Sequence, residues 1–136
     1  MDHRDYSPSQ TATRFQSGTP PIPPIYAGIA GIELMEEIGI AETREHVQAL
    51  NHRLIDGIDD LRVQLATTKK RQRRGALVCV RSRNAPELVT ALRREGIVTS
   101  SRDRNLRISA HCYNSLSDVD AVLGALERNR RLLVPA

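Results

Sequence analysis

A long stripe of aliphatic residues constrains the fold of this chain more than any other feature. The residues recur at spacings of three and four over about five helical turns. They are Val47, Leu50, Leu54, Ile58, Leu61 and Leu65. Because an apolar face of this length has to be buried, we expect a long helix that packs against a core.

The same periodicity predicts three further helices. One spans residues 25–39, where Gly39 supplies a stop signal, and a short one spans 84–96. The last begins at Ser115, which stands three residues before Asp118 as a capping pair. Val119, Val122, Leu123 and Leu126 give this last helix its inward face.

Short apolar stretches predict the strands. GALVCV at 75–80 is continuous and rich in β-branched residues, as in a buried strand. Two more strands are expected at 97–100 and 106–110, separated by a polar turn at 101–105. Two helices followed by strand, helix, strand, strand and helix predict an α+β fold, with a small, mostly antiparallel sheet covered on one face by helices.

Length and composition restrict the class of protein. The 136 residues fit one domain, and with no Trp and one Phe its core has to be aliphatic. No apolar run approaches the roughly 20 residues that span a bilayer, so we expect a cytoplasmic protein. Cys79 and Cys112 are spaced neither as a zinc motif nor as a disulfide framework, so we expect both to stay reduced and no metal site.

Patterning divides the chain into three parts. Residues 1–13 are polar and without periodicity, which predicts a flexible N-terminal arm. The domain itself is expected over 14–130, and a short tail over 131–136.

The net charge of +4 is concentrated in KKRQRR at 69–74. Five positive charges in six residues could neutralise phosphates and bind nucleic acid without sequence preference. However, no aromatic residues alternate with the charges to stack on bases. The run therefore favours a solvated loop between a helix and a strand.

His111 and Cys112 suggest a nucleophile or a metal site. Neighbouring residues on a strand point to opposite faces, so we expect that these two do not act together. Cys79, inside the apolar stretch, reads as an ordinary buried thiol.

Several motifs together resemble a known family. They are RFQSGTP at 14–20, a helix ending in EEIG at 36–39, and LRISAHCYNSLSDVDAVLGAL at 106–126. In this order they resemble the C-terminal part of class V aminotransferase-fold enzymes, a group that includes cysteine desulfurases, kynureninase and isopenicillin epimerase-like proteins. The resemblance covers about Arg14 to Leu126. It implies the small domain of a fold-type I enzyme that depends on pyridoxal phosphate.

The resemblance also assigns site residues. Arg107 matches the arginine that holds the substrate carboxylate, and Gly18 and Thr19 match a turn that touches the cofactor phosphate of a neighbouring subunit. The chemistry is suitable, because a guanidinium makes paired hydrogen bonds to a carboxylate and glycine lets backbone N–H groups approach an anion. From alternation alone, Arg107 is an exposed strand arginine on the face opposite Leu106, and Gly18 lies in an ordinary turn.

One part of the family pattern is absent. Those enzymes bind the cofactor through a lysine in a large N-terminal domain, whereas this chain has only Lys69 and Lys70, both in the basic run. The chain is thus similar to the small domain alone, as a truncated, separately encoded or excised piece. We expect it to be catalytically silent by itself and to join a large domain or second subunit, as a homo-oligomer acting on an amino acid.

Two alternatives remain open, a non-catalytic interaction module that keeps this fold and a nucleic-acid binder. The resemblance bears on the reaction as well. Desulfurases place their reactive cysteine in the loop before the arginine strand, and SSRDRN at 100–105 has none, which disfavours desulfuration.

Overall fold

The computed structural model describes residues 7–136 and groups them into two compact units. The first ends at Ile38, and the second runs from Gly39 to Ala136. Residues 1–6 of the expected arm lie outside the described residues. The single domain over 14–130 stays a prediction.

The first unit contains a short 3-10 helix, η1 (Ala12–Phe15), and the helix α1 (Ile22–Ile38). Pro23 and Pro24 lie in the first turn of α1, where a missing N–H costs nothing. The helix stops before Gly39, which has a φ of 91°. The predicted helix at 25–39 is confirmed, and α1 buries none of its residues.

The second unit begins with α2 (Ile40–Asp60), which carries most of the aliphatic stripe. The stripe predicted a helix as far as Leu65, but α2 ends five residues earlier. Arg62 adopts a positive φ of 52°, which turns the chain out of the helix. Leu65 then pairs with Val80 in an isolated antiparallel bridge, so it reaches the same core from an extended segment.

The sheet has three antiparallel strands, β1 (Leu77–Arg81), β2 (Ser100–Arg102) and β3 (Asn105–Ser109), in the order β1-β3-β2. The predicted number of strands was right, but the strand expected at 97–100 was wrong in its bounds, since only Ser100 of it lies in β2, and the turn was wrong as well. Only Asp103 and Arg104 separate β2 from β3, with φ values of 51° and 61°. Positive φ at both central residues is typical of a tight two-residue hairpin, which adds Ser101 and Arg102 to β2.

The two later helices are α3 (Ala85–Arg94) and α4 (Leu116–Arg128). Both predicted starts are confirmed. Asn84 accepts a hydrogen bond from the backbone of Glu87, and Ser115 forms a capping box with Asp118. Hydrogen bonds from the Ser115 backbone and from the Asn114 side chain lower the pKa of Asp118 below its ordinary value of 3.8.

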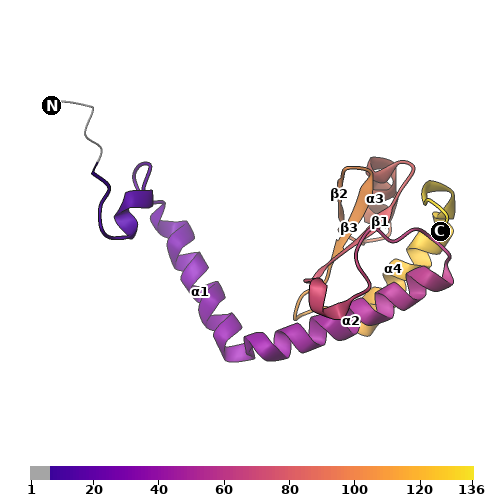
Figure 1. Ribbon diagram of the computed structural model, residues 1–136, viewed down its shortest axis with the longest axis horizontal. Helices are drawn as coiled ribbons and strands as arrows, with labels where there is room; N and C mark the ends of the chain where they lie inside the picture. Colours follow the sequence, from indigo (N-terminus) through magenta and orange to yellow (C-terminus); the bar gives the residue numbers. More distant parts are fainter. Residues whose placement is uncertain (1–6) are drawn as a thin grey trace. The chain divides into compact units, whose positions relative to one another are not determined.

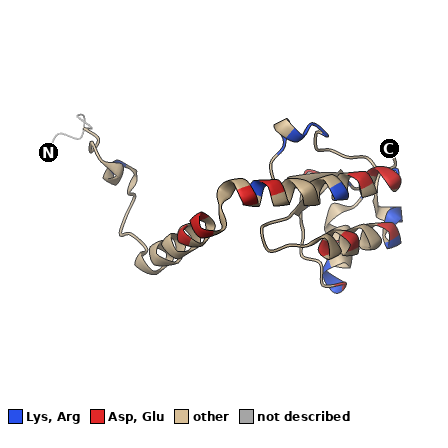
Figure 2. Ribbon diagram, turned by 90° about the horizontal axis from the view of Figure 1, so that it is seen from below, with Lys and Arg blue, Asp and Glu red and all other residues tan. Residues whose placement is uncertain are grey.

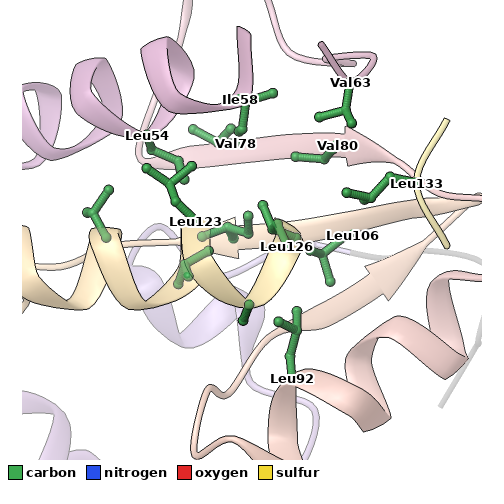
Figure 3. Packing of buried hydrophobic residues seen from close by; sticks show 14 of the residues in the cluster. Leu54, Ile58, Val63, Val78, Val80, Leu92, Leu106, Leu123, Leu126 and Leu133 are labelled. Carbon is green, nitrogen blue, oxygen red and sulfur yellow. The ribbon is translucent and has the colours of Figure 1, made fainter. Parts of the chain in front are cut away.

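The core lies between the sheet and the helices (Figure 3). Leu54 and Ile58 of α2 meet Leu123 and Leu126 of α4 on one side of β1 and β3, and Leu92 of α3 packs nearby. These residues are aliphatic, as the composition required.

Two of the last six residues, which were expected to form a tail, belong to this core. Leu132 and Leu133 are buried, and a short 3-10 helix, η3 (Arg130–Leu132), brings them there. The backbone N–H of Val134 then donates to the carbonyl of Arg81 at 3.2 Å, so the end of the chain runs beside β1. Leu132 and Leu133 hold the segment in place by apolar burial.

In the second unit, α4 runs beside α2 with the three strands on one side of the pair (Figure 1). The predicted α+β class is confirmed, with helices on one face of a small antiparallel sheet. Among the helices of the second unit, residues 39–136, none covers the opposite face. None of the described helices is long and apolar enough to cross a membrane.

Candidate functional site

Arg107 stands in the middle of the sheet, because it lies at the centre of β3 and β3 is the central strand. Its neighbours in sequence, Leu106 and Ile108, point into the core. Alternation therefore turns Arg107 to the face that the helices leave open. The expectation that the arginine points out of the core is confirmed by this pattern.

The cross-strand partners of Arg107 are small. The register places it opposite Cys79 of β1 and opposite Ser100 of β2. Directly paired residues share one face, with Cβ atoms about 5 Å apart. Arg107 is half-buried between them, and within residues 7–136 no hydrogen bond or ion pair engages its guanidinium. Its hydrogen-bond donors therefore remain available to an anion.

Gly18 and Thr19 lie in the first unit, in a bend between η1 and α1, and both are exposed. A Cβ added at Gly18 would meet nothing within 4 Å. Gly18 does not adopt a positive φ either, since only Gly39 and Gly96 do so among the described glycines. The conformation of this unit therefore gives no reason for a glycine at this position.

The residues of this chain do not by themselves fit a complete site for pyridoxal phosphate. Lys69 Nζ lies 2.5 Å from the carboxylate of Asp59, and Lys70 is exposed beside it in the basic run. A lysine held in an exposed ion pair is not in the desolvated setting that favours a reactive amine. Neither lysine lies on the sheet face of Arg107.

The basic run is largely engaged in internal contacts. Arg71 pairs with Glu45 at 2.5 Å, in addition to the pair between Lys69 and Asp59. Arg74 is buried, and its Nε donates to Gln48 Oε1 at 3.3 Å. Figure 2 shows the run in blue around η2 (Arg71–Arg73). Three of the five cations thus have partners within the chain, but only Arg74 is buried, and its contacts support a structural interpretation of this part of the run.

The strand argument made for His111 and Cys112 was wrong. His111 Nδ1 lies 3.1 Å from Cys112 Sγ, and the imidazole stacks on Tyr113 with ring centroids 5.2 Å apart. The pair is not on a strand, because β3 ends at Ser109 and the chain turns there. The alternation argument therefore does not apply to these residues.

Sequence reasoning missed two arginines that share the face of Arg107. Arg81 ends β1 and Arg102 ends β2, and both lie opposite Asn105 of β3. Arg81 lies two positions after Cys79 and Arg102 lies two positions after Ser100, and this alternation was the sequence signal that could have placed both arginines on the face of Arg107. For Arg102 the signal was not applicable, because this residue was expected in a turn.

A hollow of about 490 Å³ lies between α2, α4 and the ends of the strands. Its lining includes Leu50, Leu54, Ile108 and Val122, which belong to the core side of the sheet. Arg107 is not part of it. The hollow and the arginine face are therefore separate features.

Comparison with known proteins agrees with this architecture. A family model for aminotransferase class V matches residues 2–122. The chain therefore belongs to the aminotransferase class V family, which is dependent on pyridoxal phosphate.

Two curated relatives are similar in sequence. The uncharacterised aminotransferase YcbU of Bacillus subtilis (strain 168) is 27% identical over 111 residues, which is 82% of this chain and 30% of that protein. A probable cysteine desulfurase of Pyrococcus abyssi (strain GE5 / Orsay) is 28% identical over 140 residues, which is 90% of this chain and 34% of that protein. The chain thus spans about a third of the length of the curated relatives that it matches.

Solved structures share the fold. A cysteine desulfurase from Thermococcus onnurineus NA1 superposes with a TM-score of 0.81 at 24% identity, covering 93% of this chain and 35% of that one. The cysteine desulfurase CsdA of Escherichia coli superposes with a TM-score of 0.71 at 22% identity, covering 93% of this chain and 35% of that one. These similarities support the small-domain architecture that the motifs implied.

Proposed function

We propose that this chain is the small-domain portion of a class V aminotransferase-like enzyme that acts on an amino acid. Its share of the active site is a carboxylate-binding arginine, Arg107. The observation that carries the proposal is the position of this residue, half-buried at the centre of an open sheet face, where no residue among 7–136 pairs with its charge.

The chemistry of Arg107 suits a carboxylate. A guanidinium presents its N–H donors in a planar fork, which matches the two oxygens of a carboxylate. The rigid central strand fixes the backbone of Arg107 on both sides, through pairing with β1 and β2. The small side chains of Cys79 and Ser100 leave room beside it for a ligand.

We assign Gly18 and Thr19 to the cofactor phosphate of a neighbouring subunit. The support is that both residues are exposed and that the structure of the first unit gives Gly18 no conformational role. A phosphate would use the close backbone approach that a glycine allows, together with the Thr19 hydroxyl. This role requires the homo-oligomer that the family resemblance implies.

The proposed reaction is not desulfuration. The segment directly before β3, the strand that carries Arg107, is the two-residue hairpin turn Asp103-Arg104, and it contains no thiol. Cys112 follows β3 instead, where its nearest polar partner is His111. We therefore do not propose the activity of the desulfurase relatives for this chain.

We further propose that the isolated chain is catalytically silent and acts in the cytoplasm after joining a large domain or second subunit. Exposed apolar residues of α1 offer the contact surface for such a partner; they include Ile22, Ile25, Ile29 and Ile32. The non-catalytic module is the alternative. It predicts a chain that ignores both cofactor and amino acid.

The silence of the chain is tested by titrating it with pyridoxal phosphate. Absorbance, a borohydride trap and mass spectrometry follow any lysine adduct, with a variant that carries Lys69→Ala and Lys70→Ala as control. We expect no saturable visible band. A band that traps on one lysine and disappears in the variant would contradict the proposal.

Carboxylate binding is tested by titrating the labelled chain with L-glutamine and recording ¹H–¹⁵N spectra. We expect weak, saturable shifts around Cys79, Ser100 and Arg107. The substitution Arg107→Gln should remove them, whereas Arg94→Gln, which changes an exposed arginine of α3, should leave them intact. Equal shifts in both variants would exclude Arg107 as the carboxylate ligand.

A further inference from the structure

The open face of the sheet carries a second row of cationic side chains beside Arg107. In this row Arg81 and Arg102 flank Asn105, one from each outer strand, because both pair with Asn105 in the register. The three residues share the face of Arg107, since Asn105 and Arg107 are two positions apart on β3.

Arg107 lies within reach of both outer arginines. Each of them is a diagonal neighbour of Arg107 across one strand pair, which corresponds to a Cα separation of about 7–8 Å. Long side chains interact over this distance. Three arginine side chains therefore emerge from one small area of the sheet face.

Among the described residues, the three arginines have one ion pair between them, which joins Arg102 to Asp103. The Asp103 carboxylate lies 3.6 Å from Arg102 Nε, but both side chains are more than three-quarters exposed, so this ion pair contributes little. Arg81 has no ion pair within residues 7–136. The enclosed Oδ1 of Asn105 accepts no hydrogen bond there either, so neither arginine is directed to it.

Packing does not explain the row. Arg81 and Arg102 are exposed, the core uses the opposite face of β1 and β3, and β2 buries none of its residues. Like charges on neighbouring strands repel each other, so the row costs free energy in the absence of an anion. A ligand with negative charge at this position would remove that cost and gain charge-assisted hydrogen bonds.

We propose that Arg81 and Arg102 form a second anionic subsite next to Arg107, and that the substrate is an amino acid with a carboxylate in its side chain. The inference rests on the proposed role of Arg107 in holding the α-carboxylate. Arg107 takes one carboxylate of the substrate, and the outer pair takes the other. An acidic amino acid of the aspartate or glutamate type meets both requirements.

The planar guanidinium favours a carboxylate over a simple point charge. Nucleic acid fits less well, because the face is only three short strands wide and carries no aromatic side chain for stacking. The position of the subsite within one rigid sheet also means that the unliganded chain already presents it.

The experiment compares L-glutamate with L-glutamine, which have nearly the same shape and differ in one negative charge. Dissociation constants come from ¹H–¹⁵N titrations of the full chain at low salt. We expect the chain to bind L-glutamate about tenfold more tightly than L-glutamine, as for one additional charge-assisted contact. This preference should shrink as salt is added.

Three variants separate the two roles. The substitutions Arg81→Gln and Arg102→Gln, made one at a time, should each lower the affinity of the chain for L-glutamate to its affinity for L-glutamine. Neither substitution should change the binding of L-glutamine. Arg107→Gln should weaken both ligands. The matched control Arg94→Gln should keep the tenfold preference.

Two outcomes would overturn the inference in distinguishable ways. Equal affinity for both ligands, lost together in Arg107→Gln, would leave the carboxylate arginine in place and remove the second subsite. If neither ligand bound the unchanged chain, the result would contradict both the carboxylate-binding role of Arg107 and the second subsite. The spectra also report folding, and the backbone hydrogen bonds of Arg81 to Gln64 and Val134 do not depend on its side chain.

Discussion

A single arginine of the basic run has a structural role that its neighbours do not share. Arg74 is only 8% exposed, and its contacts are the side-chain oxygen of Gln48 at 3.3 Å and the Lys69 carbonyl at 3.1 Å. Gln48 donates in return to the Arg74 carbonyl at 3.2 Å. This reciprocal contact joins α2 to the segment that enters β1.

Replacing Arg74 by alanine should therefore destabilise the fold. Hydrogen bonds to a charged group contribute about 1.5–3 kcal/mol, and Gln48 Oε1 would be left buried without a donor. We expect the free energy of unfolding to fall by about 2 kcal/mol in urea denaturation. The matched change Arg73→Ala removes the same charge from an exposed position and should stay within about 0.5 kcal/mol. Equal losses would show that the run acts only through its charge.

Individual residues mark the limit of what the sequence could predict. The capping box of Ser115 and Asp118 was predictable, because its partners are three residues apart and their chemistry is local. The burial of Arg74 was not, since its partner Gln48 is 26 positions away. Arg81 and Arg102 were missed for the same reason, because only the strand register brings them to the face of Arg107.

Among the elements, α2 and α4 approach each other closely at a glycine. A Cβ on Gly57 would lie 2.3 Å from Cδ1 and 2.7 Å from Cδ2 of Leu123, far inside contact distance. Leu123 is itself buried in the core, so it has little freedom to move. The pair therefore sets how near the two helices can lie.

Gly57→Ala should destabilise the fold although alanine is the better helix former. Overpacking costs about 1–3 kcal/mol, against a propensity gain of about 1 kcal/mol. Gly124→Ala on α4 is the matched control, because its nearest neighbour is the flexible end of Arg128 at 3.2 Å. We expect it to be neutral or stabilising by up to about 1 kcal/mol in the same urea experiment.

The cause of the Gly57 effect can be checked in a Leu123→Ala background. There Gly57→Ala should lose its penalty, since the obstructing side chain is gone. An unchanged penalty would contradict the steric explanation.

The elements themselves were predictable where the pattern was long. The stripe from Val47 fixed the presence of α2, but its end depended on a backbone reversal at Arg62 that no periodicity signals. The hairpin between β2 and β3 was misjudged similarly. Asp103 and Arg104 read as part of a polar turn, and their positive φ values shorten it to two residues.

At the scale of the whole molecule, stability and association are expected to reside in different parts of the chain. The hydrophobic core draws its buried residues from Leu50 to Leu133, all within the second unit. The helix α1 contributes no buried residue, and its isoleucines are exposed. The sequence predicted the presence of both helices, but it could not show that α1 buries no residue whereas α2 contributes to the core.

A chain limited to residues 39–136 should therefore unfold with the same urea midpoint as the full chain, because the core is complete without α1. The full chain should associate as its concentration rises, whereas the shorter chain should remain monomeric, since it lacks the exposed apolar helix. Sedimentation measures the association, and circular dichroism follows unfolding. A lower midpoint or the loss of a cooperative transition would mean that α1 stabilises the core. Association of the shorter chain would instead place the contact surface on the second unit, where the open sheet face is the exposed candidate.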